Sequence, residues 1–139
     1  MQYDSSNIFA KMIRGEFSAH KVAETDTALV IMDAFPQTRG HVLVIPKAPA
    51  RNLLDADPAV LSAMMPLIQR VANAVKQVTN ADGIRLAQFS EAAAGQSVFH
   101  LHFHIMPVYD DVPLGAHSNQ KADDAELADL AKKIAAILT

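Results

Sequence analysis

The feature of this sequence that most restricts its fold is a run over residues 99–105 in which histidine alternates with apolar residues. Successive side chains of a β-strand point to opposite faces, so a strand here would place His100, His102 and His104 on one face and the apolar residues on the other. Neighbouring histidines would lie about 7 Å apart, which is two strand rises. The pattern predicts a strand over about 97–106 with one buried apolar face.

Four further segments are predicted to be strands because they are rich in apolar and β-branched residues and are bounded by turn residues: 20–24, 28–32, 41–45 and 84 to about 89. The first two surround a polar turn at 25–27 and should form a hairpin. Proline has no backbone N–H to donate, so Pro46 and Pro107 are expected to end the strands that precede them.

Three helices are predicted from apolar residues at helical spacing. The first is short, with Ser5 or Ser6 as its cap and an end near Gly15; its apolar face is Ile8, Phe9, Met12 and Ile13. The second is long, with Asp57 as N-cap and Pro58 as first residue, and should end near Val78. Because Pro66 lacks an N–H, this helix should kink there or start later.

The third helix begins near Asp123, after an irregular arm that contains Pro113 and Gly115. A chain of 139 residues can bury roughly 68–70% of its unfolded surface in a single core. The elements together indicate an α+β domain built on a sheet of about five mostly antiparallel strands. The arm and helix of residues 108–139 are expected to pack on that same domain.

Charge and composition exclude several classes of function. The net charge of −3 provides no basic field that could hold long nucleic acid. With no cysteine, the chain has no disulfide, thiolate metal ligand or cysteine nucleophile. No stretch approaches the ~20 apolar residues of a membrane span, and the N-terminus does not read as a signal peptide. A cytoplasmic protein is therefore expected.

Two chemistries compete for the three alternating histidines. Neutral imidazoles could hold a metal such as zinc, which often takes three of them. Alternatively, one imidazole is a nucleophile, and the others tune its protonation and bind the anionic group under attack. Gln96 and Ser97 follow Gly95 and supply amide, hydroxyl and backbone donors, which favours a site that binds phosphate. Small residues at 92–95 would let the backbone approach that phosphate closely.

These residues resemble the histidine-triad (HIT) family, whose signature is three alternating histidines with apolar residues between and after them. The resemblance extends over residues 1–107, which we predict to be a HIT domain with a HIT-like fold. Further matching segments are Ile8-Phe9 with Lys11, Asp33 before a Pro-Gln loop, the strand from Gly40-His41 to Pro46-Lys47, and Ala94 to Val98.

The resemblance implies a role for each matching position. His102, the middle histidine, would be the nucleophile that forms a covalent nucleotidyl-histidine intermediate, and Asp33 would accept the ribose hydroxyls. The other implied roles are a polar network around the nucleophile from His41, His100 and His104, a base pocket lined by Ile8, Phe9 and Ile31, and phosphate binding by Gln96 and Ser97.

The implied activity is hydrolysis of nucleoside 5′-phosphoramidates or related purine nucleotide conjugates, by a homodimer formed through the long helix. Family branches that transfer nucleotides to sugar phosphates have glutamine as the third residue, so His104 indicates water as the final acceptor. Two alternatives remain: dinucleoside polyphosphate hydrolysis, and a nucleotide-binding scaffold with little turnover.

Two departures from the family bear on these expectations. Many bacterial relatives carry a structural zinc on a cysteine pair and a histidine, where this chain has Asn7, Ala10 and Pro49, so no cofactor and no metal are expected. Relatives also have an Asn-rich segment ending in Gly where this chain has Phe89-Ser90-Glu91. That change removes an amide that relatives often place near the leaving group.

Overall fold

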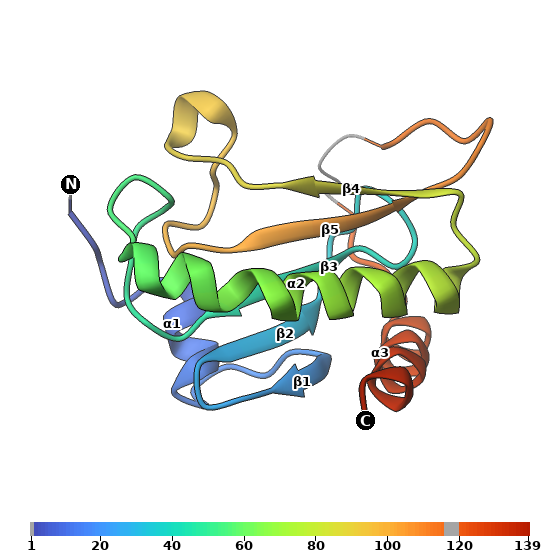
Figure 1. The fold of residues 1–139 in the computed structure, drawn as a ribbon, viewed down its shortest axis with the longest axis horizontal. Helices are drawn as coiled ribbons and strands as arrows, with labels where there is room; N and C mark the ends of the chain where they lie inside the picture. The colour runs from blue at the N-terminus through green and yellow to red at the C-terminus, as the bar shows by residue number, and fades with distance from the viewer. Residues whose placement is uncertain (1, 116–119) are drawn as a thin grey trace.

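The computed structural model describes residues 2–115 and 120–139, and His117 lies outside them. In this part of the chain, five strands and three α-helices follow one another (Figure 1), with a single 3₁₀ turn, η1. Their bounds are α1 Ile8–Ile13, β1 Lys21–Glu24, β2 Ala28–Met32, β3 Val42–Pro46, α2 Pro58–Thr79, β4 Gly83–Ala87, η1 Ala92–Ala94, β5 Phe103–Val108 and α3 Asp124–Leu138.

The strands form one sheet in the order β1-β2-β3-β5-β4, and every neighbouring pair is antiparallel. The register places Ile31 opposite Leu43, and Leu43 opposite His104. Directly opposite residues of an antiparallel pair share a face of the sheet. The predicted α+β fold with a five-stranded antiparallel sheet is confirmed.

The two faces of the sheet have different covers. Val30, Val42 and Phe103 belong to the main core, which α2 and α3 complete with Ile68, Val71, Leu130 and Ile134. The opposite face carries a smaller cluster, made by Phe9 of α1 with Leu29, Ile31, Leu43 and Ile45. Because Leu43 and His104 are directly opposite, the side chain of His104 lies on this second face, the one beside α1.

Helix α2 begins where the sequence predicts. The Asp57 side chain accepts a hydrogen bond from the Ala59 N–H at 2.8 Å, and Pro58 occupies the first turn, where no N–H is needed. The helix is continuous through Pro66, so the expectation of a later start is wrong. Pro66 lies on the exposed side, where water can bond the carbonyl that the proline leaves without a donor. Within the described residues, no helix is long and apolar enough to cross a membrane.

The cap predicted for α1 is wrong by one residue. The N-cap is Asn7, whose Oδ1 accepts from the Ala10 N–H at 2.9 Å. Ser6 does not cap the helix, because its hydroxyl and its N–H both donate to Asp4 Oδ1, at 2.6 and 2.8 Å. Asn7 is nearer than Ser6 to the N–H groups of the first helical turn, which have no partner within the helix, so Asn7 is the cap.

Strand β5 starts later and ends later than expected. Continuing its register with β3 would set Leu101 opposite Pro46, which has no N–H, and the Leu101 N–H instead donates to Ala50 O at 2.9 Å. The strand therefore begins at Phe103, so His100 and His102 precede it. It also passes through Pro107, because that residue lies beyond the last β3 pair and is paired with β4 only.

The arm after β5 returns to the loop between β2 and β3. The Gly115 N–H donates to Gln37 O at 2.9 Å, and the Ala122 N–H donates to Ala34 O at 2.8 Å. Helix α3 begins where the sequence predicts, and Asp123 caps it by accepting from the Glu126 N–H; α3 packs against α2, β1 and β2. Gly115 and Ala122 therefore attach the arm to the loop that precedes His41.

Candidate active site

The β2–β3 turn and β5 bring together Asp33, His41 and His104. All three side chains are buried, and their potential ligand atoms lie within 4.8 Å of one another. The backbone sets this arrangement: the Asp33 N–H donates to His41 O at 2.9 Å, immediately beyond the paired ends of β2 and β3. Three residues from distant parts of the sequence thus form one polar cluster on the α1 face.

The hydrogen bonds of His41 determine its tautomer. Its Nδ1 lies 3.1 Å from the backbone N–H of Gln37, which can only donate, so Nδ1 carries the lone pair. The ring hydrogen of neutral His41 is therefore on Nε2, 2.9 Å from His104 Nδ1. Since His104 Nδ1 accepts this bond, the hydrogen of neutral His104 is on its Nε2. The Gln37 N–H, His41 and His104 thus form a chain of hydrogen bonds in which each group donates to the next.

Neutral His102 is the opposite tautomer to His41 and His104. Its Nδ1 lies 2.6 Å from the carbonyl oxygen of His100, which can only accept, so Nδ1 carries the hydrogen. The lone pair of neutral His102 is consequently on Nε2, the nitrogen that a nucleophile of this kind needs. The His102 ring lies 4.9 Å from the His104 ring and 4.8 Å from the Phe9 ring, both measured between centroids.

His100 has a separate environment. Its Nε2 donates to Pro46 O at 2.7 Å, and its Nδ1 accepts from the Tyr3 hydroxyl at 2.7 Å. Burial lowers the pKa of His100, against the opposing effect of the bond to Pro46. The ring is therefore neutral at neutral pH and holds in place the backbone carbonyl that fixes the tautomer of His102.

Asp33 is a buried carboxylate with one oxygen committed to the fold. Its Oδ1 accepts from the Phe35 N–H at 2.8 Å, which shapes the turn after β2. Its Oδ2 is 3.5 Å from His41 Nε2, further than the 2.9 Å that separates Nε2 from His104. Oδ2 can accept a hydrogen bond from a bound hydroxyl while Oδ1 keeps the turn in place.

Gln96 and Ser97 lie on the loop between η1 and β5 but differ in exposure. The Gln96 side chain is 5% exposed, and its amide makes four hydrogen bonds within the protein, to the Glu91 N–H, Asn52 Nδ2, Arg51 O and Val98 O. Ser97 is exposed. The loop therefore presents Ser97 to a ligand, while the Gln96 amide is committed to the loop itself.

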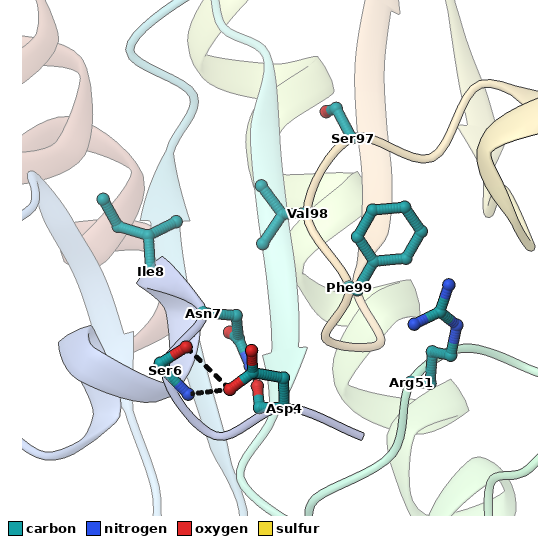
Figure 2. Close-up of a pocket in the computed structure, with 8 residues that line it drawn as sticks. All are labelled: Asp4, Ser6, Asn7, Ile8, Arg51, Ser97, Val98 and Phe99. Carbon is teal, nitrogen blue, oxygen red and sulfur yellow. Dashed lines mark hydrogen bonds between the residues drawn. The ribbon is translucent and has the colours of Figure 1, made fainter. Parts of the chain in front are cut away.

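A pocket of about 340 Å³ opens beside Ser97 (Figure 2). Its lining comes from the N-terminal segment, from α1, from Arg51 and from the loop before β5: Asp4, Ser6, Asn7, Ile8, Arg51, Ser97, Val98 and Phe99. Ile8 and Val98 also pack against the small apolar cluster that contains Phe9, the residue in contact with His102. The pocket is thus connected to His102 through the apolar cluster that contains Phe9.

The three residues predicted for a base pocket lie together on the α1 face. Phe9 and Ile31 are buried in the same cluster, and Ile8 is half-buried against it. Ile31 also lines a second hollow of about 280 Å³ between α1 and the hairpin, together with Met12, Phe17 and Leu29. These side chains make the α1 face of the sheet apolar at β2, the strand that Asp33 follows.

Distance alone would allow Asp33, His41 and His104 to hold a metal ion, but their hydrogen bonding does not suit one. A ligating His41 Nε2 must carry a lone pair, which would put the ring hydrogen on Nδ1, facing the N–H of Gln37. Two donors would then oppose each other in a buried place. The cluster is better suited to a hydrogen-bond relay than to a metal centre.

The positions at which related bacterial proteins would hold a structural zinc do not fit that ion either. Asn7 Oδ1 caps α1, and its Nδ2 donates to the Tyr3 hydroxyl at 3.1 Å and to Asp4 O at 2.8 Å. Ala10 and Pro49 have no side-chain atom that could ligate zinc. Here a hydrogen-bonded chain from Asn7 through Tyr3 to His100 links α1 to the histidines.

Sequence reasoning missed two groups of residues at the site. Tyr3 bonds His100 across 97 positions of sequence, and no local pattern signals such a contact. Arg51 and Glu91 form a bidentate ion pair behind the Ser97 loop. For Glu91 there was one signal, because the family resemblance implies a segment ending in glycine where this chain has Phe89-Ser90-Glu91.

Comparison with known proteins gives consistent matches. The HIT domain family model matches residues 14–111. Adenylylsulfatase HINT3 of Arabidopsis thaliana is 40% identical over 100 residues, covering 72% of this chain and 51% of that protein. The chain thus spans about half the length of this curated relative.

Two solved structures are similar over almost the whole chain. A Hit-like protein involved in cell-cycle regulation from Bartonella henselae, solved with an unknown ligand, has a TM-score of 0.93 and 45% identity, with 99% of each chain covered. A Zn-bound histidine triad family protein from Mycobacterium smegmatis has a TM-score of 0.84 and 33% identity, with 96% of this chain and 93% of that chain covered. The arm and α3 lie within the Bartonella match.

Proposed function

Since the chain belongs to the HIT domain family, we propose that it hydrolyses nucleoside 5′-phosphoramidates or related purine nucleotide conjugates through a covalent intermediate on His102. The observation that carries this proposal is the hydrogen bond from His102 Nδ1 to the His100 carbonyl, because it leaves the lone pair on Nε2. Displacement at phosphorus by an imidazole needs a neutral nitrogen with that lone pair.

The first step forms a bond between His102 Nε2 and the α-phosphorus and breaks the bond from phosphorus to the leaving amine. The amine leaves with the bonding electron pair and takes a proton from solvent, because the hydrogen bonds of the flanking histidines correspond to their neutral forms. The substituted His102 ring is then positively charged, and the His100 carbonyl that accepts its Nδ1–H stabilises that charge. Water next attacks phosphorus and releases a proton to solvent. The bond from phosphorus to Nε2 breaks with its electron pair returning to Nε2, so the nucleotide leaves and His102 is neutral again.

The remaining site residues bind the substrate in this proposal. The Nε2–H of His104, oriented by His41, stabilises the charge on a phosphoryl oxygen, and Ser97 donates to another. Ile8, Phe9 and Ile31 contact the base. We assign the Gln96 amide to positioning of the loop rather than to phosphate contact, because its four hydrogen bonds are made within the protein.

A panel of substrates tests the proposal and separates it from its alternatives. The panel contains an adenosine and a guanosine phosphoramidate, a dinucleoside polyphosphate, and adenosine 5′-phosphosulfate, which the name of the Arabidopsis relative suggests. Turnover of the phosphoramidates should exceed the others and should persist in excess EDTA, because the polar cluster does not suit a metal. Preference for the dinucleoside polyphosphate would favour that alternative. Nucleotide binding without turnover of any member would favour a scaffold.

Replacing Asp33 with Ala should weaken the binding of ribonucleosides much more than that of their deoxy analogues. A carboxylate that accepts ribose hydroxyls makes charge-assisted bonds, so the expected loss is about 1.5–3 kcal/mol. Asp33→Asn is the matched control, because it keeps an oxygen for the Phe35 N–H and should lose less affinity. Calorimetric titration with adenosine and 2′,3′-dideoxyadenosine measures the difference. Equal losses for both sugars would remove Asp33 from the ribose site.

The proposal includes a homodimer formed through α2 and the adjacent edge of the sheet. Strand β4 ends the sheet, where its Leu86 is 46% exposed, and Met65 of α2 is 50% exposed. Replacing either residue with Asp should shift the protein from dimer to monomer in sedimentation velocity, because a charge would be buried at the interface. Ile137→Asp, on the exposed side of α3, is the control and should stay dimeric. A monomeric wild type would contradict this part of the proposal.

A further inference from the structure

The structure contains an unusual backbone conformation immediately before η1. Glu91 has φ 77° and ψ 158°, a region that glycine adopts readily and other residues almost never do. Such a conformation persists only where the surrounding contacts determine it. The neighbours of Glu91 must therefore hold it in place.

Several strong contacts hold Glu91. Arg51 donates to the two carboxylate oxygens from Nε at 2.8 Å and from Nη2 at 2.9 Å, which is the bidentate geometry of a guanidinium on a carboxylate. Asn52 Nδ2 donates to the same carboxylate at 2.6 Å. The Glu91 N–H donates to Gln96 Oε1 at 2.8 Å, and the Glu91 carbonyl accepts from the Gln96 N–H at 3.2 Å.

Arg51 is itself fixed on the wall of the Ser97 pocket. Its guanidinium carbon lies 4.2 Å from the centre of the Phe99 ring, and its carbonyl accepts from Gln96 Nε2 at 2.7 Å. Figure 2 shows Arg51 and Phe99 together on one side of that pocket. Hydrogen bonding to Arg51 lowers the pKa of Glu91, and hydrogen bonding to Glu91 raises the pKa of Arg51, so both groups are ionised at neutral pH.

These contacts enclose the loop that carries Ser97. Glu91 holds its beginning, and the Gln96 amide joins Glu91, Asn52, Arg51 and the Val98 carbonyl across it. Ser97 is the exposed residue between Gln96 and Val98, so its position follows from theirs. The Glu91 carboxylate already accepts from three N–H groups, which indicates a structural use rather than contact with a substrate.

We propose that Arg51 and Glu91 are positioning residues that act as a clamp, holding the loop of residues 91–97 so that Ser97 meets the phosphate of a bound nucleotide. The inference rests on the proposed function for its ligand, a nucleoside 5′-phosphate group. It adds to that function the ion pair that sets the geometry of the phosphate site.

Calorimetric titration with AMP and with adenosine tests the clamp, because the two ligands differ only in the phosphate. Glu91→Gly removes the carboxylate but accepts the backbone conformation, so this variant should fold as well as the wild type. Its affinity for AMP should fall about tenfold, while its affinity for adenosine should change less than twofold. Arg51→Met should give the same pattern, and the double variant should be no worse than either single variant, because the two residues act as one unit.

Two further variants sharpen the test. Arg51→Lys keeps the charge but loses the bidentate fork, so its loss of AMP affinity should be intermediate. Glu24→Gln removes a carboxylate from a surface ion pair with Lys47, away from the loop, and should leave the AMP to adenosine ratio unchanged. Thermal unfolding of each variant checks that the fold is retained.

The outcomes separate the clamp from the proposed function. A wild type that binds AMP no more tightly than adenosine contradicts the phosphate site of the proposed function. It also contradicts the clamp, which is proposed to position Ser97 for that phosphate. A wild type that prefers AMP, with Glu91→Gly and Arg51→Met retaining that preference, overturns the clamp alone. Loss of the preference in both variants, with adenosine binding intact, supports it.

Discussion

Replacing His102 with Asn is expected to lower kcat/KM by roughly 10⁴-fold, the loss typical of a covalent catalyst without its attacking atom. Asn retains a hydrogen-bonding side chain but has no nucleophilic nitrogen. The affinity for the product nucleotide should change little, because the proposed base and ribose contacts come from other residues. Steady-state kinetics on the best substrate of the panel, with calorimetric titration of AMP, measures both quantities.

His20→Asn is the matched control for this variant. His20 is a histidine outside the site that pairs with Asp124 of α3, so the same substitution there should leave kcat/KM within about twofold of the wild type. If the His102 variant kept most of the activity, attack by an imidazole would be excluded. Direct attack by water would then be the mechanism to consider.

Gly40→Ala should destabilise the protein by about 2–4 kcal/mol, the largest loss of stability expected from adding a single methyl group near the site. Gly40 has φ 94°, which disfavours alanine, and an added Cβ would lie 2.6 Å from Thr79 Cγ2 and 3.1 Å from Pro107 Cγ. Both neighbours belong to packed elements, α2 and β5. Urea denaturation monitored by circular dichroism measures the change in the free energy of unfolding.

Gly15→Ala separates backbone strain from steric overlap. Gly15 also has a positive φ of 78°, but an added Cβ there would meet nothing within 4 Å. This variant should lose only about 1–2 kcal/mol, the contribution of the left-handed backbone. Equal losses in the two variants would show that Thr79 and Pro107 move aside at little cost. The neighbouring His41 would then keep its position in the Gly40 variant.

The sequence was sufficient for those parts of the fold that depend on local pattern. Runs of apolar and β-branched residues identified the strands that carry Ile31 and Leu43, and Asp57-Pro58 identified the start of α2. The start of β5 could not be predicted in this way, because it depends on the partners of Leu101. The Leu101 N–H donates to Ala50 O, and Pro46, which would lie opposite Leu101, has no N–H; both residues lie more than fifty positions earlier in the chain.

The candidate site was partly predictable for the same reason. A period-two pattern correctly places His102 and His104 side by side, but it does not show that His100 turns to Tyr3 and Pro46. The tautomers of the histidines could not be predicted from the sequence, because backbone atoms of Gln37 and His100 determine them. Backbone groups carry no residue-type signal, so only the folded geometry reveals them.

The same distinction applies to the loop before β5. Gln96 was predicted to bind phosphate because its type and position suit that role, yet its amide is used to hold Glu91, Arg51 and Val98. The residue type indicates hydrogen bonding but not its partner. The Gln96 side chain is buried, and buried amides are as a rule bonded within the protein, which supports the proposed positioning role.

The most direct test of covalent catalysis is to trap the intermediate on His102. Wild-type protein mixed with a radiolabelled nucleoside phosphoramidate and quenched within milliseconds should carry a nucleotidyl group that is labile in acid and stable in base, as phosphorus–nitrogen bonds to imidazole generally are. Mass spectrometry should locate the group on the peptide that contains residues 100–104. Formation of the adduct at a rate no slower than turnover is the predicted result. Consumption of substrate with no adduct at any quench time, or an adduct that also forms on the His102→Asn variant, would contradict it.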